Sequence, residues 1–329
     1  MKIFSEKPVR YRHSDVNLGI LDRLFIKSVL DQSSFNQRMF DEDFTRIFSY
    51  RNRDGGKFFD ISSSDNDLAS RLISKVQTNY ASRSLDKIII EWAEEIARSF
   101  LWFGSAHYIL NDENDKDQIH IESFSSSGIA HLFGRHIQWV PKRTKRHWDR
   151  DDEVLSRTIR ILDPDKVMCF TMPKAIKRML SSQSRTLALL DRHQFSVADF
   201  QPHATHENPN PSTYFDFGTW RDTQESALYR ATRCTGWNGR KYDASKRSDF
   251  FDCYRLIRFR RNQLVLRDEI LSQISAEISR VGKRYNTGFS VRILGTDKLP
   301  NIAQLNEMEA RLAREEVSFA EVIDYCLKR

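Results

Sequence analysis

Residues 249–285 carry the strongest structural signal in the sequence, and they run DFFDCYRLIRFRRNQLVLRDEILSQISAEISRVGKRY. Apolar residues recur in this stretch at intervals of seven, in two series: Ile257, Leu264, Leu271 and Ile278, then Ile274 and Val281. A seven-residue apolar repeat places one face of a helix against a partner. The stretch therefore predicts one long helix of about 30 residues with a buried seam.

The same stretch is rich in arginine, with five residues and no acid between positions 255 and 267: Arg255, Arg258, Arg260, Arg261 and Arg267. A second basic run lies beside Trp148 and consists of Lys142, Arg143, Lys145 and Arg146. Basic side chains close to aromatic residues suit contact with a nucleic-acid backbone. We predict these nine residues as nucleic-acid-binding. A solvated helix face and ion pairs between subunits are the alternatives.

Shorter elements precede the long helix. Ser84 is suited to begin a helix and Gly104 to end it, and between them apolar residues recur at steps of three and four. Alternating residues then predict a hairpin from 106–110 and 118–124. Further strands are predicted at 137–140, 158–162 and 166–171, each stopping near a proline, followed by a helix at 174–193.

After the long helix, the sequence predicts a strand at 289–293, a helix at 302–315 and a last helix that opens at the capping box of Ser318 and Glu321. The fold class is therefore α+β, with mixed helices, short antiparallel strands and one long helix in the C-terminal half. Four segments are expected: an N-terminal helical segment (1–83), an α/β body (84–198), a long irregular loop (199–248), and the long helix with a strand and two short helices (249–329).

Composition narrows the class of protein. The chain has 329 residues, with 40% hydrophobic residues and a formal net charge of +7. The 22 Phe and 6 Trp indicate a folded chain, and the positive charge favours a polyanionic partner such as DNA. No apolar run approaches the length of a membrane span and the N-terminus lacks a signal-peptide core, so neither a membrane nor a secreted location is expected. The four cysteines are expected to be reduced core thiols.

Motifs for catalysis are absent from the sequence. It contains no phosphate-binding loop, no dinucleotide fingerprint and no nucleophile elbow. His203 and His206 lack further ligands at a metal-site spacing. Asp163, Asp165 and Lys166 resemble a nuclease motif, but a turn before a strand explains them better. We therefore expect no catalytic residue, no metal and no cofactor.

Two short motifs resemble the portal proteins of tailed phages. Residues 102–109 (WFGSAHYI) are similar to the family's helix that ends at glycine and continues as a strand with an aromatic residue, although Ser105 replaces the usual asparagine. Residues 162–170 (LDPDKVMCF) are similar to a later strand, although Phe170 lacks the usual preceding histidine. The order that follows, a long helix, a strand, Pro300 and two short helices, also resembles the family.

The resemblance covers roughly residues 85–325 as an order of elements. It implies a structural subunit of a ring-shaped homo-oligomer that forms a DNA conduit for genome packaging and ejection. It also implies double-stranded DNA, a packaging ATPase and head-completion proteins as partners, a location in a virion or host cytoplasm, and a long helix that packs side by side between subunits. The alternative is a basic nucleic-acid-binding protein or metal-dependent nuclease of viral or mobile-element origin. A third possibility is an interaction protein whose charge is incidental.

Overall fold

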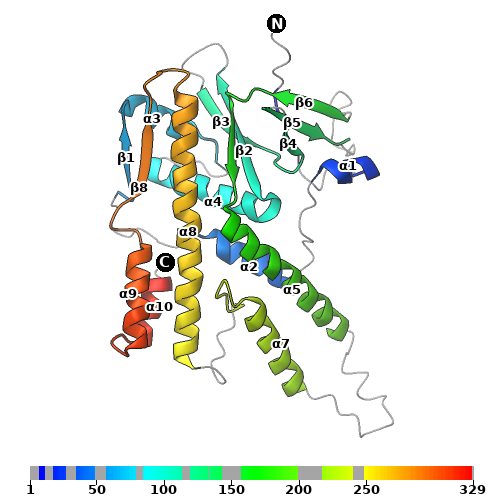
Figure 1. Ribbon diagram of the computed structural model, residues 1–329, viewed down its shortest axis with the longest axis vertical. Coiled ribbons are helices and arrows are strands. Elements are labelled where there is room, and N and C mark those ends of the chain that lie inside the picture. Colours follow the sequence, from blue (N-terminus) through cyan, green and yellow to red (C-terminus); the bar gives the residue numbers. More distant parts are fainter. Residues whose placement is uncertain are drawn as a thin grey trace. The chain divides into compact units, whose positions relative to one another are not determined.

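The computed structural model describes residues 7–11, 18–26, 35–48, 57–78, 84–112, 119–132, 134–142, 157–198, 217–239 and 248–327, with the side chains of 191–198 and 217–221 excepted. The chain forms two compact units, and each combines segments that are distant in the sequence. The first comprises 1–30, 55–172 and 267–299, and the second comprises 31–54, 173–266 and 300–329. The expected α+β class, with short antiparallel strands and one long helix, is confirmed (Figure 1).

The first unit holds all eight strands of the described residues together with three short or medium helices. Its elements are α1 (Ile20–Phe25), β1 (Phe59–Ser63), α3 (Asn66–Ser74), α4 (Leu85–Phe103), β2 (Ser105–Asp112), β3 (Ile119–Phe124), β4 (Ile129–Leu132), β5 (Arg135–Val140), β6 (Thr158–Leu162), β7 (Val167–Thr171) and β8 (Val291–Gly295). The strands form three antiparallel sheets, ordered β1-β8, β3-β2-β7 and β4-β5-β6. The strand β1 lies in the segment that the sequence predicted as helical.

Helix α4 shows why the sequence prediction succeeds in this region. The Ser84 side chain accepts a hydrogen bond from the amide of Lys87, and Gly104 ends the helix with a φ of 73°. The buried face of α4 includes Trp92, whose ring meets Tyr108 and Phe170 edge-on at centroid distances of 5.7 and 5.9 Å. These two rings come from β2 and β7, so aromatic packing fixes the helix against the central sheet.

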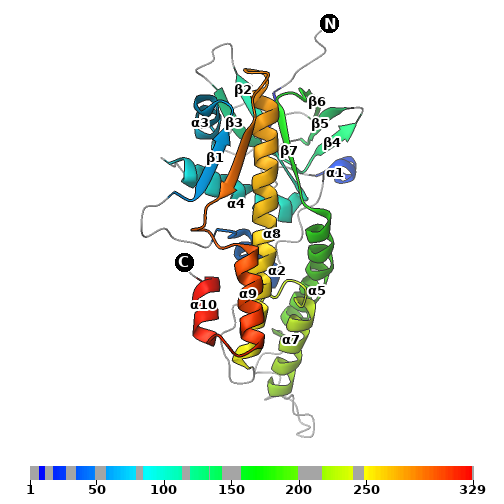
Figure 2. The same ribbon diagram turned by 60° about the vertical axis from the view of Figure 1, so that its left-hand side comes forward.

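The second unit is helical among the described residues (Figure 2). Its elements are α2 (Phe35–Thr45), α5 (Lys174–Ala198), α7 (Phe217–Ala231), α9 (Ile302–Ala313), α10 (Phe319–Leu327) and the first half of α8 (Asp249–Gly282). The predicted capping box opens α10, since Ser318 and Glu321 exchange hydrogen bonds. None of the described helices combines the length and hydropathy needed to cross a membrane.

Helix α7 corrects the prediction that 199–248 is one irregular loop. That prediction rested on the prolines at 202, 209 and 211 and on the glycines at 236 and 239. Between them, residues 219–231 contain no proline or glycine and include helix-forming Glu225, Ala227 and Leu228. Leu228 is 4% exposed. A single buried leucine was too weak a periodic signal to predict the helix.

The long helix α8 is confirmed, but the partner expected for its seam is wrong. All six apolar residues of the two series are at most 4% exposed within one chain. In the second unit Ile257 and Leu264 pack with Leu305 of α9. A seven-residue repeat shows that one face is buried, and it does not specify which chain supplies the partner. The seam is therefore used inside the subunit and is not available between subunits.

Serine hydroxyls tie α8 to the edge of a sheet in the first unit. Strand β8 pairs with β1 along one edge. Along the other edge, the amides of Val291 and Ile293 donate to the hydroxyls of Ser279 and Ser275 at 2.9 and 3.0 Å. These bonds satisfy donors that would otherwise be unpaired at a strand edge. The edge of β8 is therefore closed to a further strand at these two positions.

The cysteines are free thiols in two kinds of surroundings. Cys253 and Cys326 are buried, as predicted, and burial raises the pKa of Cys326 to about 12. A thiol with such a pKa stays protonated and unreactive at neutral pH. Cys169 is half-buried and Cys234 is exposed, so the prediction of core thiols is wrong for Cys234.

Candidate nucleic-acid interface

Arg255 lies inside the second unit, with 5% of its surface exposed. Its guanidinium donates to the carbonyl oxygens of Tyr229, Thr232 and Trp237, at 3.2, 3.3 and 2.6 Å. It also donates to the Thr232 hydroxyl and to the Asn238 side chain, each at 2.6 Å. The end of α7 and the segment that follows it therefore fold around this cation.

The close fit around Arg255 explains why residue 236 is a glycine. Gly236 has a φ of 83°, and a Cβ atom there would lie 2.3 Å from the Arg255 carbonyl oxygen. The next residue, Trp237, is buried and donates its indole N–H to Asp43 at 2.9 Å. The segment is thus held at both its backbone and its aromatic ring, and Arg255 acts as an interior fold residue.

Arg260 and Gln263 complete the C-terminal end of α2. The Gln263 amide donates to the carbonyl oxygens of Asp43, Phe44 and Arg46 at 2.8, 3.3 and 3.1 Å. Arg260, 3% exposed, donates to the carbonyl of Ile47 at 3.4 Å and to Gln263 at 3.1 Å. The last carbonyls of a helix lack partners within the helix and carry partial negative charge. The buried amide of Gln263 and the buried guanidinium of Arg260 supply the hydrogen-bond donors and the positive charge that these carbonyls lack.

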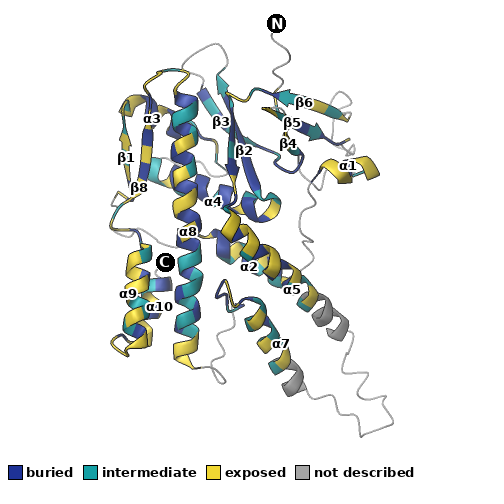
Figure 3. Cartoon of the chain, in the orientation of Figure 1, coloured by how far each residue is buried: buried dark blue, intermediate teal, exposed yellow. Residues whose placement is uncertain are grey.

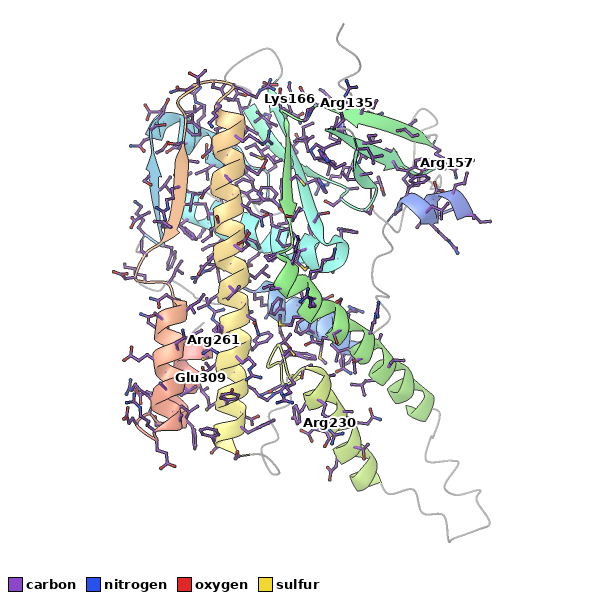
Figure 4. The ribbon with its side chains drawn as sticks, viewed as in Figure 1. Arg135, Arg157, Lys166, Arg230, Arg261 and Glu309 are labelled. Atoms are coloured by element: carbon purple, nitrogen blue, oxygen red, sulfur yellow. The ribbon has the colours of Figure 1, made fainter. Side chains whose placement is uncertain are left out.

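The other three arginines of α8 are also engaged within the chain. Arg267 is 4% exposed and pairs with Asp268 at 2.7 Å. Arg261 pairs with Glu309 of α9 (Figure 4). Arg258 is half-buried, donates to the Arg233 carbonyl at 3.0 Å, and lies 4.9 Å from the centre of the Tyr254 ring. Of the five, Arg258 and Arg261 are half-buried, whereas Arg255, Arg260 and Arg267 are buried.

The second predicted basic run is only partly visible. Lys142 is exposed directly after β5. Arg143, Lys145 and Arg146 lie outside the described residues. The structure therefore shows that each of the five arginines of α8 has contacts within the chain.

Sequence reasoning missed the exposed bases of α5. Lys174, Lys177, Arg178 and Arg185 are all exposed on this helix. None of them takes part in a side-chain hydrogen bond or ion pair with the described residues. The sequence did indicate a basic helix here, because residues 174–190 contain these four bases and no acid.

The nuclease-like acids form a turn, as predicted. The carboxylate of Asp163 accepts a hydrogen bond from the amide of Asp165 at 3.0 Å, directly before β7. Lys166 pairs with Asp112, and Arg284 donates to the same carboxylate at 3.2 Å. Burial raises the pKa of Asp112, but these cations outweigh it and hold the pKa below its ordinary value. Asp112 of β2 is thus balanced by Lys166 and by Arg284, which lies two residues after the end of α8.

Histidines gather between strands of the first unit. His107 of β2 is 5% exposed, and its Nε2 atom lies 3.5 Å from the Cys169 sulfur of β7. The rings of His107 and His136 are 6.4 Å apart, and those of His131 and His136 are 4.9 Å apart. Within the described ranges, no three His, Cys, Asp or Glu residues are arranged to hold a metal ion. His203 and His206 lie outside those ranges.

Comparison with known proteins gives matches to solved structures. No protein-family model and no curated protein matches the sequence. The chain is similar to a HK97 family phage portal protein from Corynebacterium diphtheriae, with 11% identity, coverage of 85% of this chain and 98% of that chain, and a TM-score of 0.43. It is also similar to a chain in the virion of a native gene transfer agent particle, with 10% identity, coverage of 89% and 90%, and a TM-score of 0.44.

A chain in the neck of the native gene transfer agent particle, computed with C12 symmetry, matches with 11% identity, 88% coverage of each chain and a TM-score of 0.42. The resemblance to portal proteins is thus confirmed as a likeness to these solved structures. At such identities and TM-scores the likeness concerns the arrangement of elements. The function proposed below rests on the residues of this chain.

Proposed function

We propose that this chain is a portal-like structural subunit. Copies of it form a ring-shaped homo-oligomer that serves as a conduit for double-stranded DNA during genome packaging and ejection, in a virion or host cytoplasm. A packaging ATPase and head-completion proteins are its partners in this proposal. The chain itself is assigned no chemical step.

The pairing of β2 with β7 is the observation that carries the proposal. The two motifs on which the portal resemblance rests, 102–109 and 162–170, are separated by more than fifty residues of sequence. In the fold they are neighbouring strands, with Ala106 opposite Phe170 and Ile109 opposite Val167. Two weak motifs that meet in one sheet support a common origin more than either motif does alone.

Helix α1 supports self-association, because it buries an acidic side chain and exposes apolar ones, unlike a solvated surface helix. Asp22 is fully buried, receives the Arg157 guanidinium at 2.9 Å and accepts the Trp139 indole N–H at 2.9 Å. The apolar side chains of Ile20 and Leu24 are 86% and 74% exposed. Contiguous exposed apolar side chains mark interaction surfaces, and we propose a second copy of this chain as the partner.

The proposal assigns DNA contact to the accessible members of the predicted set. Lys142 is exposed and Arg258 is half-buried, so both are candidates for phosphate contact. Arg255, Arg260 and Arg267, which are at most 5% exposed, support the fold that presents such residues. Arg261 forms an ion pair with Glu309 within the chain.

Mass photometry of the purified chain at two salt concentrations, with and without duplex DNA, tests the proposal. We expect a discrete species of many subunits without DNA, whose mass is a multiple of 38.7 kDa. A monomer or dimer that binds DNA would contradict the ring and favour the nucleic-acid-binding alternative. Metal-dependent cleavage of the duplex would favour the nuclease.

The variant Ile20→Ser/Leu24→Ser tests the proposed contact between copies. We expect it to shift the chain to smaller species without unfolding it, because both side chains are exposed in the subunit. Arg23→Ser on the same helix is the matched control, since Arg23 is exposed and is not apolar. Equal assembly of the two variants would exclude α1 from the interface.

A further inference from the structure

Helix α5 presents a basic face that the predicted site does not include. Its buried side is formed by Ile176, Leu180 and Leu187, which are at most 6% exposed. Lys174, Arg178, Ser181 and Arg185 are exposed at successive steps of four, three and four residues, with Lys177 beside them. These steps follow one side of an α-helix. Figure 3 shows exposed positions along α5.

We infer that this basic face of α5 binds the phosphate backbone of double-stranded DNA. The identity of the partner as DNA rests on the proposed function, whereas the site itself rests on the arrangement of charge. Residues 174–190 contain no acid, so no carboxylate of this segment competes with a phosphate for the four cations. Cations that meet phosphate release condensed counterions, and this release drives the binding.

The contrast with α8 separates cations of the fold from cations of a site. Every arginine between 255 and 267 has a partner within the chain. The side chains of Lys174, Lys177, Arg178 and Arg185 make no such contact with the described residues. A run of like charges on one face raises the cost of bringing the cations together, and a bound polyanion removes that cost.

The dimensions of the face suit a duplex. The twelve residues from Lys174 to Arg185 rise about 16 Å along the helix axis. B-DNA carries about five phosphates per strand over that length. Ser181 and Ser182 are exposed between the cations and are small.

The packing of α5 holds this face outward. Gln183, on the buried side, is 3% exposed and hydrogen-bonds to Thr235. Helices α2 and α7 pack against α5 within the same unit. On α7, the carboxylate of Glu225 accepts a hydrogen bond from the Tyr229 hydroxyl. The basic face thus lies opposite the packed side of α5 within the second unit.

A salt titration of duplex binding tests the inference on the full chain. The test variant is Lys174→Gln/Lys177→Gln/Arg178→Gln/Arg185→Gln. Each lost phosphate contact lowers the slope of log affinity against log salt by about 0.9. Four contacts therefore predict that, between 50 and 200 mM salt, the wild type loses about 100-fold more affinity than the variant loses.

The matched control neutralises two lysines and two arginines that are exposed in the first unit: Lys87→Gln, Lys298→Gln, Arg71→Gln and Arg292→Gln. It carries the same change in net charge, so we expect a slope close to that of the wild type. Thermal unfolding of both variants confirms that they remain folded, because all eight residues are exposed.

Equal slopes for the two quadruple variants, or no duplex binding by the wild type, would overturn the inference. Mass photometry of the same samples without DNA separates this result from the proposed function. A ring that persists in the α5 variant while its DNA affinity falls supports both proposals. A monomeric wild type that loses DNA affinity only with the α5 substitutions supports the site and contradicts the portal-like assembly.

Discussion

Replacing Arg255 by lysine separates a fold residue from a DNA contact, because the substitution keeps the charge. The guanidinium makes five hydrogen bonds to four residues in a space that is 5% exposed. An ammonium group has three donors and no planar fork, so at least two of these bonds are lost. Hydrogen bonds to charged groups contribute about 1.5–3 kcal/mol each. The expected loss in the free energy of unfolding is about 3–5 kcal/mol.

Urea unfolding followed by tryptophan fluorescence measures this loss, because Trp237 lies in the same cluster and is 3% exposed. Arg258→Lys is the control, since Arg258 is half-buried and its two side-chain hydrogen bonds go to Arg233 and Tyr254. We expect it to cost about 1 kcal/mol or less. If Arg255→Lys unfolds within about 1 kcal/mol of the wild type and weakens duplex binding, the interior role of Arg255 is wrong.

Two further substitutions test local features of the fold. Burial raises the pKa of Asp41 from 3.8 to about 7, against the effect of a hydrogen bond from Gln37. The folded chain therefore retains a proton that the unfolded chain releases, and the free energy of unfolding falls as the pH rises from about 4 to about 7. In urea unfolding, Asp41→Asn should therefore have a free energy of unfolding up to about 4 kcal/mol higher than the wild type at pH 8, and almost the same as the wild type at pH 4. An equal gain at both pH values would exclude burial of the Asp41 carboxyl as the cause. Gly236→Ala should lower the free energy of unfolding by more than about 2 kcal/mol, since a Cβ at φ 83° would lie 2.3 Å from the Arg255 carbonyl oxygen. Gly134→Ala is the control and should cost about 1 kcal/mol, since Gly134 has a φ of 75° but open space around a Cβ. Equal shifts in the thermal unfolding of the two variants would refute the steric argument.

Local sequence rules predicted the elements whose signals are local. The cap at Ser84 and the left-handed glycine at Gly104 bound α4 as expected, and alternation found the strands on either side of the turn at Asp163. The strand β1 was missed because its partner, β8, lies more than two hundred residues further along the chain. A short strand whose pairing is that distant leaves little trace in its own five residues.

The arginines of α8 show where a pattern in the sequence was read incompletely. The second apolar series, Ile274 and Val281, continues backward at the same interval of seven to Arg267 and Arg260. These two arginines therefore occupy the buried seam of the helix, and their exposed fractions of 4% and 3% agree with that position. The spacing alone could have assigned them to the interior.

Arg255 marks the limit of that argument. It lies two residues before Ile257 and falls outside both series, so the spacing of α8 places it away from the seam. It is buried because the residues after α7 fold over it, and that contact depends on a helix with no clear signal of its own. On α5, by contrast, the bases and the apolar residues occupy opposite sides of one helix, and no distant segment is needed to assign them. A basic residue can therefore be assigned to a binding face from sequence when the apolar residues of its own helix lie on the opposite side. Arg255 shows that counting charges without this pattern does not distinguish a buried base from an exposed one.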